Sequence, residues 1–338
     1  MAIKVAINGF GRIGRLTFRI LDDDPTFDVI AINDLSTAED LAYLLKYDSA
    51  HGRFKPDSIR ATEDNIIIDD RNINIYKEKD PTNLPWNELN IDVVFECTGV
   101  LTSKEKAAGH IKAGAKKVIV SAPAGEDVKT IVYNVNHHIL TGEEDIISTA
   151  SCTTNCLAPV LKVLDDNFEI ERGFMTTVHA YTNDQVTLDV AHPKGIYSRR
   201  GRTAAQNVVP TSTGAASAIG LVMPNLEGKF DGTSLRIPVQ DGSIIDLVIE
   251  LKKKTTVEDI NEVFKNNTNE TIAYTVEPIV SSDIIGTHYG ALVDGLCTNI
   301  LETDDKQLVK VLAWYDNEMG YCAQMVRTAK YIFNLINN

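Results

Sequence analysis

The sequence predicts an α/β protein of two domains: a doubly wound parallel sheet first, then an α+β domain with a largely antiparallel sheet. Up to residue 151, short apolar runs alternate with helical patterns, and beyond it longer β-rich runs replace that alternation. A length of 338 residues is also more typical of two domains than of one. We therefore expect one domain over residues 1–151 and a second over 152–317, with a last helix over 318–338 that returns to the first.

The first half begins with a short apolar strand at residues 3–7, followed by a glycine-rich turn and a helical pattern. Further strands are expected at residues 28–34, 91–99 and 117–123, with a helix over 103–114 before the last of them. Runs of this kind are typical of parallel strands buried on both faces. The carboxyl ends of such strands are where open α/β sheets bind ligands, which makes Thr98 and Ser121 candidate binding residues.

The glycine-rich turn has the spacing of a dinucleotide-binding loop. Gly9, Gly11 and Gly14 allow a tight turn, a close backbone approach to a pyrophosphate, and close packing of helix on strand. Asp34 ends the next strand, 20 residues after Gly14, where an acid accepts hydrogen bonds from a ribose diol. A glycine turn that binds nothing is the alternative, but strand, turn, helix, strand and acid in this order favour a dinucleotide site.

The second half has a different pattern, with an amphipathic helix over residues 153–168 and another over 256–267. Its β-rich runs are residues 172–181, 234–240, 243–252 and 307–317. Long strands with few helices indicate a largely antiparallel sheet covered on one face. In the last helix, one apolar stripe is expected to join the core: Met325, Ala329, Ile332, Phe333 and Ile336.

Composition excludes several classes of protein. Thirty-three basic and 47 acidic residues give a formal charge of −14, which disfavours nonspecific binding to nucleic acid or to an anionic membrane. No apolar run reaches membrane-spanning length, and the first residues do not have the pattern of a signal peptide. Five scattered cysteines argue for reduced thiols and a cytoplasmic location.

Two cysteines lie four residues apart at the start of the helix over 153–168. A metal site would need further ligands at suitable spacing, and a redox pair is usually C-x-x-C, so neither interpretation is favoured and no metal is expected. Backbone N–H groups at a helix start stabilise an anion, which favours a thiolate nucleophile at Cys152. Cys156 lies one turn further in and is expected to be inert. His179, in a strand that leads into a polar turn, is the candidate base.

Five segments together resemble the glyceraldehyde-3-phosphate dehydrogenase family. They are "INGFGRIGR", "SCTTNCLAP", "TTVHAYTNDQ", "PTSTGAA" and "WYDNEMGY", and the resemblance runs from the first residues to the last. It implies a Rossmann domain, a catalytic domain, the cofactor NAD, and a Cys152 thiolate that attacks the aldehyde of glyceraldehyde 3-phosphate. Hydride transfer then produces a thioester, which inorganic phosphate cleaves, with His179 as the base.

The resemblance also implies roles for individual residues. The expected cofactor-binding residues are Gly9, Gly11, Arg12, Ile13, Gly14, Asp34, Lys79, Thr98, Ser121 and Asn317. The substrate phosphate is expected at Thr182 and Arg236, and inorganic phosphate at Ser151, Thr153, Thr213 and Gly214, where a second helix N-terminus is expected. Asp184, Arg199 and Arg200 complete the pocket. Lys79 stands where the family commonly has arginine, and its contact is expected through the backbone.

The resemblance also implies a homotetramer, in which the loop over residues 188–202 reaches the cofactor site of a neighbouring subunit. Its arginines, Arg199, Arg200 and Arg202, are expected to find anionic partners across an interface, with a solvated loop as the alternative. Ala191 replaces a proline common in NAD-specific members, so some use of NADP is expected.

Three other functions are weighed against this one. A relative acting on erythrose 4-phosphate would use the same chemistry. Aspartate-semialdehyde dehydrogenase is less favoured, because its substrate needs a carboxylate clamp. A surface-binding role has no support in the sequence.

Overall fold

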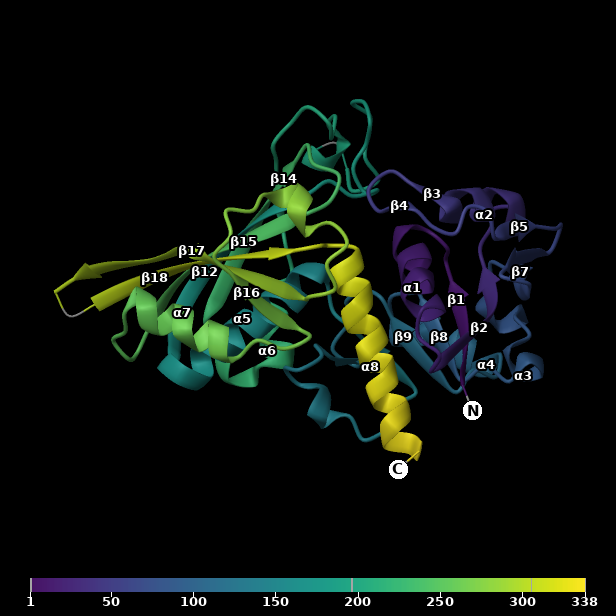
Figure 1. Ribbon diagram of the computed structural model, residues 1–338, viewed down its shortest axis with the longest axis horizontal. Helices are drawn as coiled ribbons and strands as arrows, with labels where there is room; N and C mark the ends of the chain where they lie inside the picture. Colours follow the sequence, from purple (N-terminus) through teal and green to yellow (C-terminus); the bar gives the residue numbers. More distant parts are fainter. Residues whose placement is uncertain (1, 196, 305, 338) are drawn as a thin grey trace. The chain divides into compact units, whose positions relative to one another are not determined.

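The computed structural model describes residues 2–195, 197–304 and 306–337. The chain forms two compact units, one of residues 1–151 with 322–338 and the other of residues 152–321. The last helix, α8 (Met319–Asn337), crosses the second boundary, so most of it belongs to the first unit. Figure 1 traces the chain through these elements in sequence order.

The first unit contains a nine-stranded sheet in the order β10-β11-β9-β8-β1-β2-β7-β6-β5. The pairs from β10 to β7 are parallel, and the hairpins β5–β6 and β6–β7 are antiparallel. Its strands are β1 (Ile3–Asn8), β2 (Phe27–Asn33), β5 (Ile59–Ala61), β6 (Asn65–Ile68), β7 (Arg71–Tyr76), β8 (Val93–Glu96), β9 (Lys117–Val120), β10 (Lys129–Thr130) and β11 (Ile146–Ser148), with a separate hairpin of β3 (Tyr47–Asp48) and β4 (Gly52–Arg53). Its helices before α8 are α1 (Arg12–Asp22), α2 (Ala38–Lys46), α3 (Trp86–Leu89) and α4 (Lys104–Lys112).

The expected doubly wound sheet is confirmed. β1 and β8 are its central strands, and every residue of β8 is buried. A central parallel strand is covered on both faces, which explains why these runs are continuously apolar rather than alternating. The carboxyl ends of β1, β2 and β8 therefore lie side by side at one edge of the sheet (Figure 1).

Helix α8 packs its apolar stripe into the core of the first unit. Met325, Ala329, Ile332 and Phe333 are buried there, in one cluster with residues of β1 and α1. Ile336 was expected to join them, but 48% of its surface is exposed. It belongs to the end of the helix, beyond the part that the core covers.

The second unit contains a seven-stranded sheet in the order β13-β14-β12-β15-β18-β17-β16. Four of its six strand pairs are antiparallel and two, β12–β14 and β16–β17, are parallel, so the expected largely antiparallel sheet is a mixed one. Its elements are α5 (Cys152–Phe168), β12 (Ile170–Ala180), β13 (Val209–Ser212), α6 (Ile219–Val222), β14 (Phe230–Ile237), β15 (Ser243–Leu251), α7 (Val257–Asn266), β16 (Ile272–Thr275), β17 (Ala291–Thr303) and β18 (Lys306–Tyr315).

Helices α5 and α7 cover one face of this sheet (Figure 1). On β15, Ile245, Leu247 and Ile249 face the helices and are completely buried. The opposite face carries exposed apolar side chains, which Phe174 (70% exposed) and its cross-strand neighbour Val248 (37% exposed) exemplify. A sheet with one apolar face open is suited to association with another protein surface.

Among the described residues, no helix has both the length and the apolar character needed to cross a membrane.

Candidate active site

Cys152 is the first residue of α5, as the sequence predicts. Two residues earlier, Ala150 adopts a φ of +59°, a conformation that costs a residue with a side chain about 1–2 kcal/mol. This left-handed residue ends the path of the chain from β11 and directs Ser151 and Cys152 into the helix. Local strain of this kind is commonly found at functional sites.

The structure brings Cys152 and His179 together, although they are 27 residues apart in the chain. His179 is the penultimate residue of β12, is 2% exposed, and places its Nε2 atom 3.4 Å from the Cys152 sulfur. The other ring nitrogen, Nδ1, lies 2.7 Å from the carbonyl oxygen of Ala180. This carbonyl only accepts, whereas a guanidinium nitrogen of Arg236, which only donates, lies 3.0 Å from the same Nδ1, so the two contacts favour opposite positions of the ring proton. When Nδ1 donates to the carbonyl, Nε2 of the neutral ring can accept the thiol proton.

Burial favours the neutral form of both partners. It lowers the pKa of His179 to about 3, and the positive charge of Arg236 acts in the same direction. Burial also raises the pKa of the Cys152 thiol, which Arg236 and the hydrogen bonds from Thr153 offset only in part. Desolvation thus opposes the thiolate that the sequence predicts at Cys152, whereas the charge of Arg236 favours it.

The surroundings of Cys156 favour the inert thiol that the sequence predicts. It is completely buried one turn into α5, and its thiol donates to the carbonyl oxygen of Ala313 at 3.8 Å. Burial raises its pKa well above the ordinary value, more than it does for Cys152.

Arg236 and Thr182 adjoin His179, as expected for a shared anion site. One guanidinium nitrogen of Arg236 donates to Thr182 Oγ1 at 3.1 Å and to the Ala180 carbonyl at 3.1 Å. The same nitrogen lies 3.0 Å from His179 Nδ1. A cation held beside a threonine hydroxyl is a suitable site for a phosphate group.

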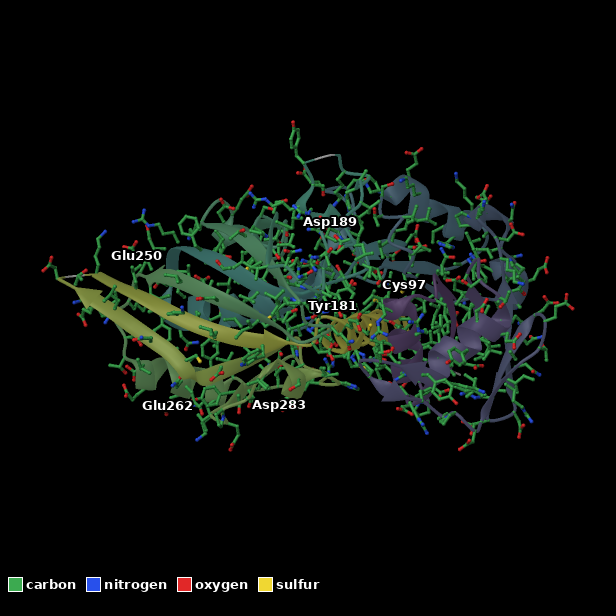
Figure 2. All side chains as sticks on the ribbon, turned by 90° about the horizontal axis from the view of Figure 1, so that it is seen from above. Cys97, Tyr181, Asp189, Glu250, Glu262 and Asp283 are labelled. Atoms are coloured by element: carbon green, nitrogen blue, oxygen red, sulfur yellow. The ribbon has the colours of Figure 1, made fainter. Side chains whose placement is uncertain are left out.

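Asp184 and Arg200 extend this chain of contacts. Thr182 Oγ1 donates to one carboxylate oxygen of Asp184, and Arg200 pairs with the other. Arg202 pairs with Asp189, which Figure 2 labels, at 2.6 Å. Arg200 and Arg202 thus have carboxylate partners within their own chain. Ile196 of the same loop lies outside the described residues.

Tyr315 is a site residue that sequence analysis missed. Its buried hydroxyl lies 2.9 Å from Thr153 Oγ1 and 2.8 Å from Thr177 Oγ1, and its ring packs edge-on against His179 at 5.8 Å. It therefore ties α5 and β12 to β18. The apolar runs of the sequence contain no signal for such a contact, because it depends on which strands become neighbours.

Asn317 is buried, and its side-chain oxygen accepts from Ser243 Oγ at 2.6 Å. Ser243 also accepts from the backbone N–H of Ala180, next to His179. Because this bond fixes the oxygen of the Asn317 amide, the amide has a defined orientation. Ser243 is a second residue that the sequence did not single out.

Thr213 and Gly214 lie in a turn after β13, and among the described residues their hydrogen bonds stay within that turn. A helix N-terminus was expected here, but α6 begins only at Ile219 and has four residues. The expectation was wrong because one turn over Gly214–Ala218 is followed by the tighter i→i+3 bonds of Ile219 to Ala216 and Leu221 to Ala218, so no regular helix begins at Gly214.

The glycine-rich turn between β1 and α1 suits a close-packed ligand. A Cβ at Gly9 would lie 2.7 Å from the Thr98 nitrogen, and one at Gly14 would lie 2.1 Å from the Gly9 carbonyl oxygen. At Gly11, by contrast, a Cβ would meet nothing within 4 Å, and no side chain caps the helix start there. Gly9 and Gly14 thus serve packing, and Gly11 leaves open space at the N–H groups of α1, including those of Arg12 and Ile13, where an anion is favoured.

Asp34 is anchored beside this turn. One carboxylate oxygen accepts from the Phe10 N–H at 2.8 Å and the other from the Ser36 N–H at 2.9 Å. Each oxygen keeps capacity for a further hydrogen bond, so the pair can accept from two ribose hydroxyls.

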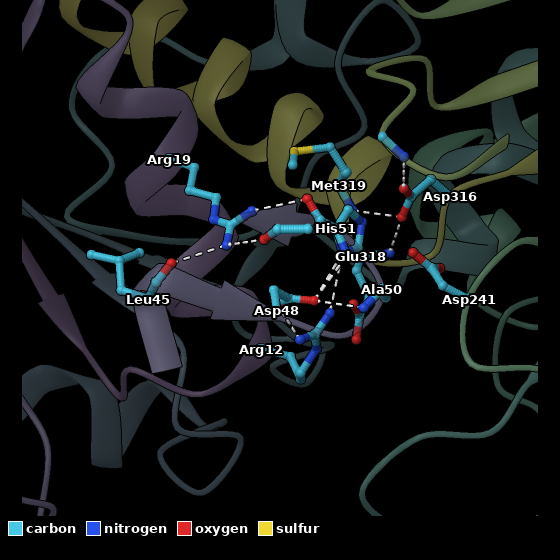
Figure 3. Close-up of polar contacts among 12 residues, drawn as sticks. Arg12, Arg19, Leu45, Asp48, Ala50, His51, Asp241, Asp316, Glu318 and Met319 are labelled. Atoms are coloured by element: carbon cyan, nitrogen blue, oxygen red, sulfur yellow. Dashed lines mark hydrogen bonds and ion pairs between the residues drawn. The ribbon is translucent and has the colours of Figure 1, made fainter. Parts of the chain in front are cut away.

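The Arg12 side chain is engaged elsewhere. Figure 3 shows its ion pair with Asp48, and its other terminal nitrogen lies 3.1 Å from His51 Nδ1. The hydrogen bonds from His51 and Arg12 hold the pKa of Asp48 far below its ordinary value despite burial. An anion at the turn would therefore meet the backbone of Arg12 rather than its guanidinium group.

The remaining expected cofactor residues lie at strand ends or in loops of the first unit. Thr98 is exposed in the turn after β8, Ser121 is half-buried directly after β9, and Lys79 is exposed in the loop after β7. The first two lie at carboxyl ends of parallel strands, where the sequence places them.

Comparison with known proteins gives one consistent result. The model of the glyceraldehyde 3-phosphate dehydrogenase NAD binding domain matches residues 3–104, and that of the C-terminal domain of the same enzyme matches residues 151–317. A glyceraldehyde-3-phosphate dehydrogenase of Clostridium pasteurianum is 56% identical over 328 residues, covering 97% of this chain and 98% of the relative. One of Streptococcus pyogenes is 51% identical over 332 residues, covering 98% of each.

Proposed function

Because the chain belongs to the glyceraldehyde-3-phosphate dehydrogenase family, we propose that it oxidises glyceraldehyde 3-phosphate through a thioester on Cys152. It is an NAD-dependent oxidoreductase of glycolysis, and the alternative substrate, erythrose 4-phosphate, is not favoured. The observation that supports the proposed chemistry best is the Cys152–His179 contact, in which the ring nitrogen Nε2 lies 3.4 Å from the sulfur.

The first step joins the sulfur to the aldehyde carbon. As the C–S bond forms, the thiol proton passes to His179 Nε2 and from there to the carbonyl oxygen, so the product is a hemithioacetal with a hydroxyl group and His179 is again neutral. Proton transfer during attack suits a pair whose resting forms are both neutral. The Ala180 carbonyl steadies the imidazolium by accepting from Nδ1 at 2.7 Å.

In the second step, His179 takes the hydroxyl proton of the hemithioacetal while hydride leaves its carbon, which leaves a thioester on Cys152. When bound, NAD supplies the hydride acceptor. Inorganic phosphate then attacks the thioester carbon and expels the Cys152 sulfur, which regains a proton. The products are an acyl phosphate and the free thiol.

Two groups of side chains would hold the phosphates. Arg236 and Thr182, which are hydrogen-bonded to each other, would hold the phosphate of the substrate. We assign inorganic phosphate to Ser151, Thr153, Thr213 and Gly214. The contact with Tyr315 holds the Thr153 side chain in place, and it supports this assignment for Thr153 alone.

The glycine turn and Asp34 would hold the adenosine half of NAD. Open space at Gly11 suits the pyrophosphate, and the Asp34 carboxylate suits the ribose diol. We further assign Thr98, Ser121 and the backbone of Lys79 to this half, and Asn317, with its amide oxygen fixed by Ser243, to the nicotinamide carboxamide.

A spectrophotometric assay of glyceraldehyde 3-phosphate and NAD, with and without phosphate, tests this function. NADH formation should continue only when phosphate is present, since a thioester that is not cleaved stops each site after one turnover. Equal steady-state rates without phosphate would exclude the phosphorolysis step.

We propose that the protein is a homotetramer, as the family resemblance implies. The face of the second unit's sheet opposite α5 and α7 offers a surface for another copy of the chain, because Phe174, Val248, Leu301 and Leu308 are exposed there. Ion pairs such as Arg172–Glu250 and Lys310–Asp246 lie among them. Light scattering should report four chains for the native protein and fewer for Phe174→Asp. An active monomer of native sequence would exclude this assembly.

We also propose that the two compact units are an NAD-binding domain over 1–151 with the last helix, and a catalytic domain that begins at Cys152. The five cysteines are all free thiols, which supports a location in the reducing cytoplasm.

A further inference from the structure

A buried hydrogen-bonded network lies beneath the carboxyl ends of β1, β2 and β8. Its centre is Glu96, the last residue of β8, which is 1% exposed. One carboxylate oxygen accepts from the side-chain amide of Asn8 and lies 3.0 Å from His110 Nε2. The other accepts from both the backbone N–H and the hydroxyl of Thr98, the first of these at 2.8 Å. We call these residues, with Asn33 and Trp86, the Glu96 network.

The direction of each hydrogen bond in this network is fixed from its ends. The backbone N–H of Glu78 donates to the Asn33 side-chain oxygen at 2.8 Å, so the Asn33 amide nitrogen donates to Asn8 at 2.7 Å. The Asn8 oxygen is thereby an acceptor, and only its nitrogen is left to face Glu96.

The histidine side of the network is fixed in the same way. The indole N–H of Trp86, which can only donate, lies 3.0 Å from His110 Nδ1. The proton of the neutral ring therefore resides on Nε2, which donates to Glu96. Four donors thus converge on Glu96, and a carboxylate is the side chain that accepts at both oxygens.

The network ends at the turn after β8 that contains Thr98. Thr98 is exposed, yet its backbone nitrogen and hydroxyl are both held by the buried Glu96 carboxylate. Gly9 packs so closely on this turn that a Cβ there would lie 2.7 Å from the Thr98 nitrogen. The position of the Thr98 turn and that of the glycine turn are therefore coupled.

We propose that Glu96 and His110 are positioning residues of the NAD site. They touch no substrate; they fix the Thr98 turn, and through it Gly9, at the place where the cofactor would bind. This inference rests on the cofactor site proposed above. Outer-shell contacts of this kind preserve binding geometry, and their loss weakens affinity without removing a direct ligand contact.

The alternative is a network that only stabilises the fold, and Glu96→Gln separates the two. The substitution replaces one of the two accepting oxygens with an NH₂ group, which only donates. That group would face either the donors of Asn8 and His110 or the two donors of Thr98, so one of these pairs would lose its acceptor. We expect the Kd for NAD, measured by calorimetry, to rise about tenfold or more. The kcat at saturating NAD and the alkylation rate of Cys152 without NAD should stay within about twofold of the native values.

Two His110 variants supply an independent comparison. In His110→Gln, the side-chain nitrogen can still donate to Glu96 and the oxygen can still accept from Trp86, so NAD affinity should be largely kept. In His110→Leu both bonds are lost, and affinity should fall several-fold. Because both variants remove the imidazole, a difference between them reports the hydrogen bonds alone.

Asn136→Ala is the matched control for stability. Asn136 is 4% exposed in the same unit and bonds the backbone of Thr130 and Val132, apart from the Glu96 network. Its loss should lower Tm without changing the Kd for NAD.

If Glu96→Gln and His110→Leu lower Tm but bind NAD as native protein does, the positioning role is excluded. If Glu96→Gln does not fold, the two His110 variants decide the matter. Failure of the native protein itself to bind NAD would instead refute the proposed cofactor site.

Discussion

Replacing His179 with asparagine tests the base of the proposed mechanism and leaves its surroundings nearly intact. The side-chain amide of asparagine can still donate to the Ala180 carbonyl, as His179 Nδ1 does at 2.7 Å. It has no counterpart of Nε2, the atom that lies 3.4 Å from the Cys152 sulfur. The variant therefore removes the proton acceptor while keeping the bond that positions it.

We expect kcat of His179→Asn to fall by about two to four orders of magnitude, the usual contribution of general acid–base catalysis. This corresponds to about 3–5 kcal/mol of barrier height. Alkylation of Cys152 by iodoacetamide should also slow, because the thiol has lost the acceptor for its proton. A folded variant with native turnover would show that His179 has only a structural role.

The same variant should respond to pH in a defined direction. The folded pKa of His179 is about 3, below its ordinary value of about 6.5, so the unfolded chain binds a proton that the folded chain excludes. This costs native stability as pH falls below 6.5, by about 2 kcal/mol at pH 5. His179→Asn escapes that cost, so its Tm relative to the native protein should rise between pH 7.5 and pH 5. A constant difference in Tm would show that His179 titrates normally in the folded protein.

Three further outcomes are expected. Cys152→Ser should abolish oxidation, because a hydroxyl is far less ionised than a thiol. Peptide mapping after mild iodoacetamide treatment should find more label on Cys152 than on the completely buried Cys156. Label mainly on Cys156, with activity kept, would refute the assignment of Cys152 as the nucleophile. Arg236→Gln should raise KM for glyceraldehyde 3-phosphate about tenfold or more through loss of a charge-assisted contact, and an unchanged KM would move the substrate phosphate elsewhere. Asp34→Ala should shift kcat/KM from NAD towards NADP, since the native carboxylate would repel a 2′-phosphate, whereas a native preference for NADP would show that the exposed Val190 and its loop outweigh Asp34.

The glycine-rich turn between β1 and α1 was predictable from sequence because its requirements are local. The spacing of Gly9, Gly11 and Gly14 follows from one turn between adjacent elements, and Asp34 directly follows the very next strand of the parallel sheet. Cys152 was placed at a helix start for the same reason. The prediction of a helix N-terminus at Thr213 and Gly214 rested on similar local reasoning. It was wrong because small residues fit a turn as well as a helix.

The contacts between distant segments could not be predicted in this way. The 3.4 Å separation of Cys152 and His179 depends on how β12 packs against α5, and Tyr315 reaches Thr153 from 162 positions away in the chain. Glu96 and His110 gave no signal either, since a buried acid and a helical histidine acquire meaning only when donors converge on them.

Burial opposes the thiolate expected at Cys152 and so changes the chemistry of the site. Desolvation disfavours the charged form of each partner, so it raises the pKa of Cys152 and lowers that of His179. Arg236 favours the thiolate but opposes the imidazolium, so its charge does not make the separated ion pair the resting state. A thiol proton that moves only as the C–S bond forms avoids a free thiolate. The thiol is thereby less open to side reactions, and it becomes nucleophilic when an aldehyde lies within reach.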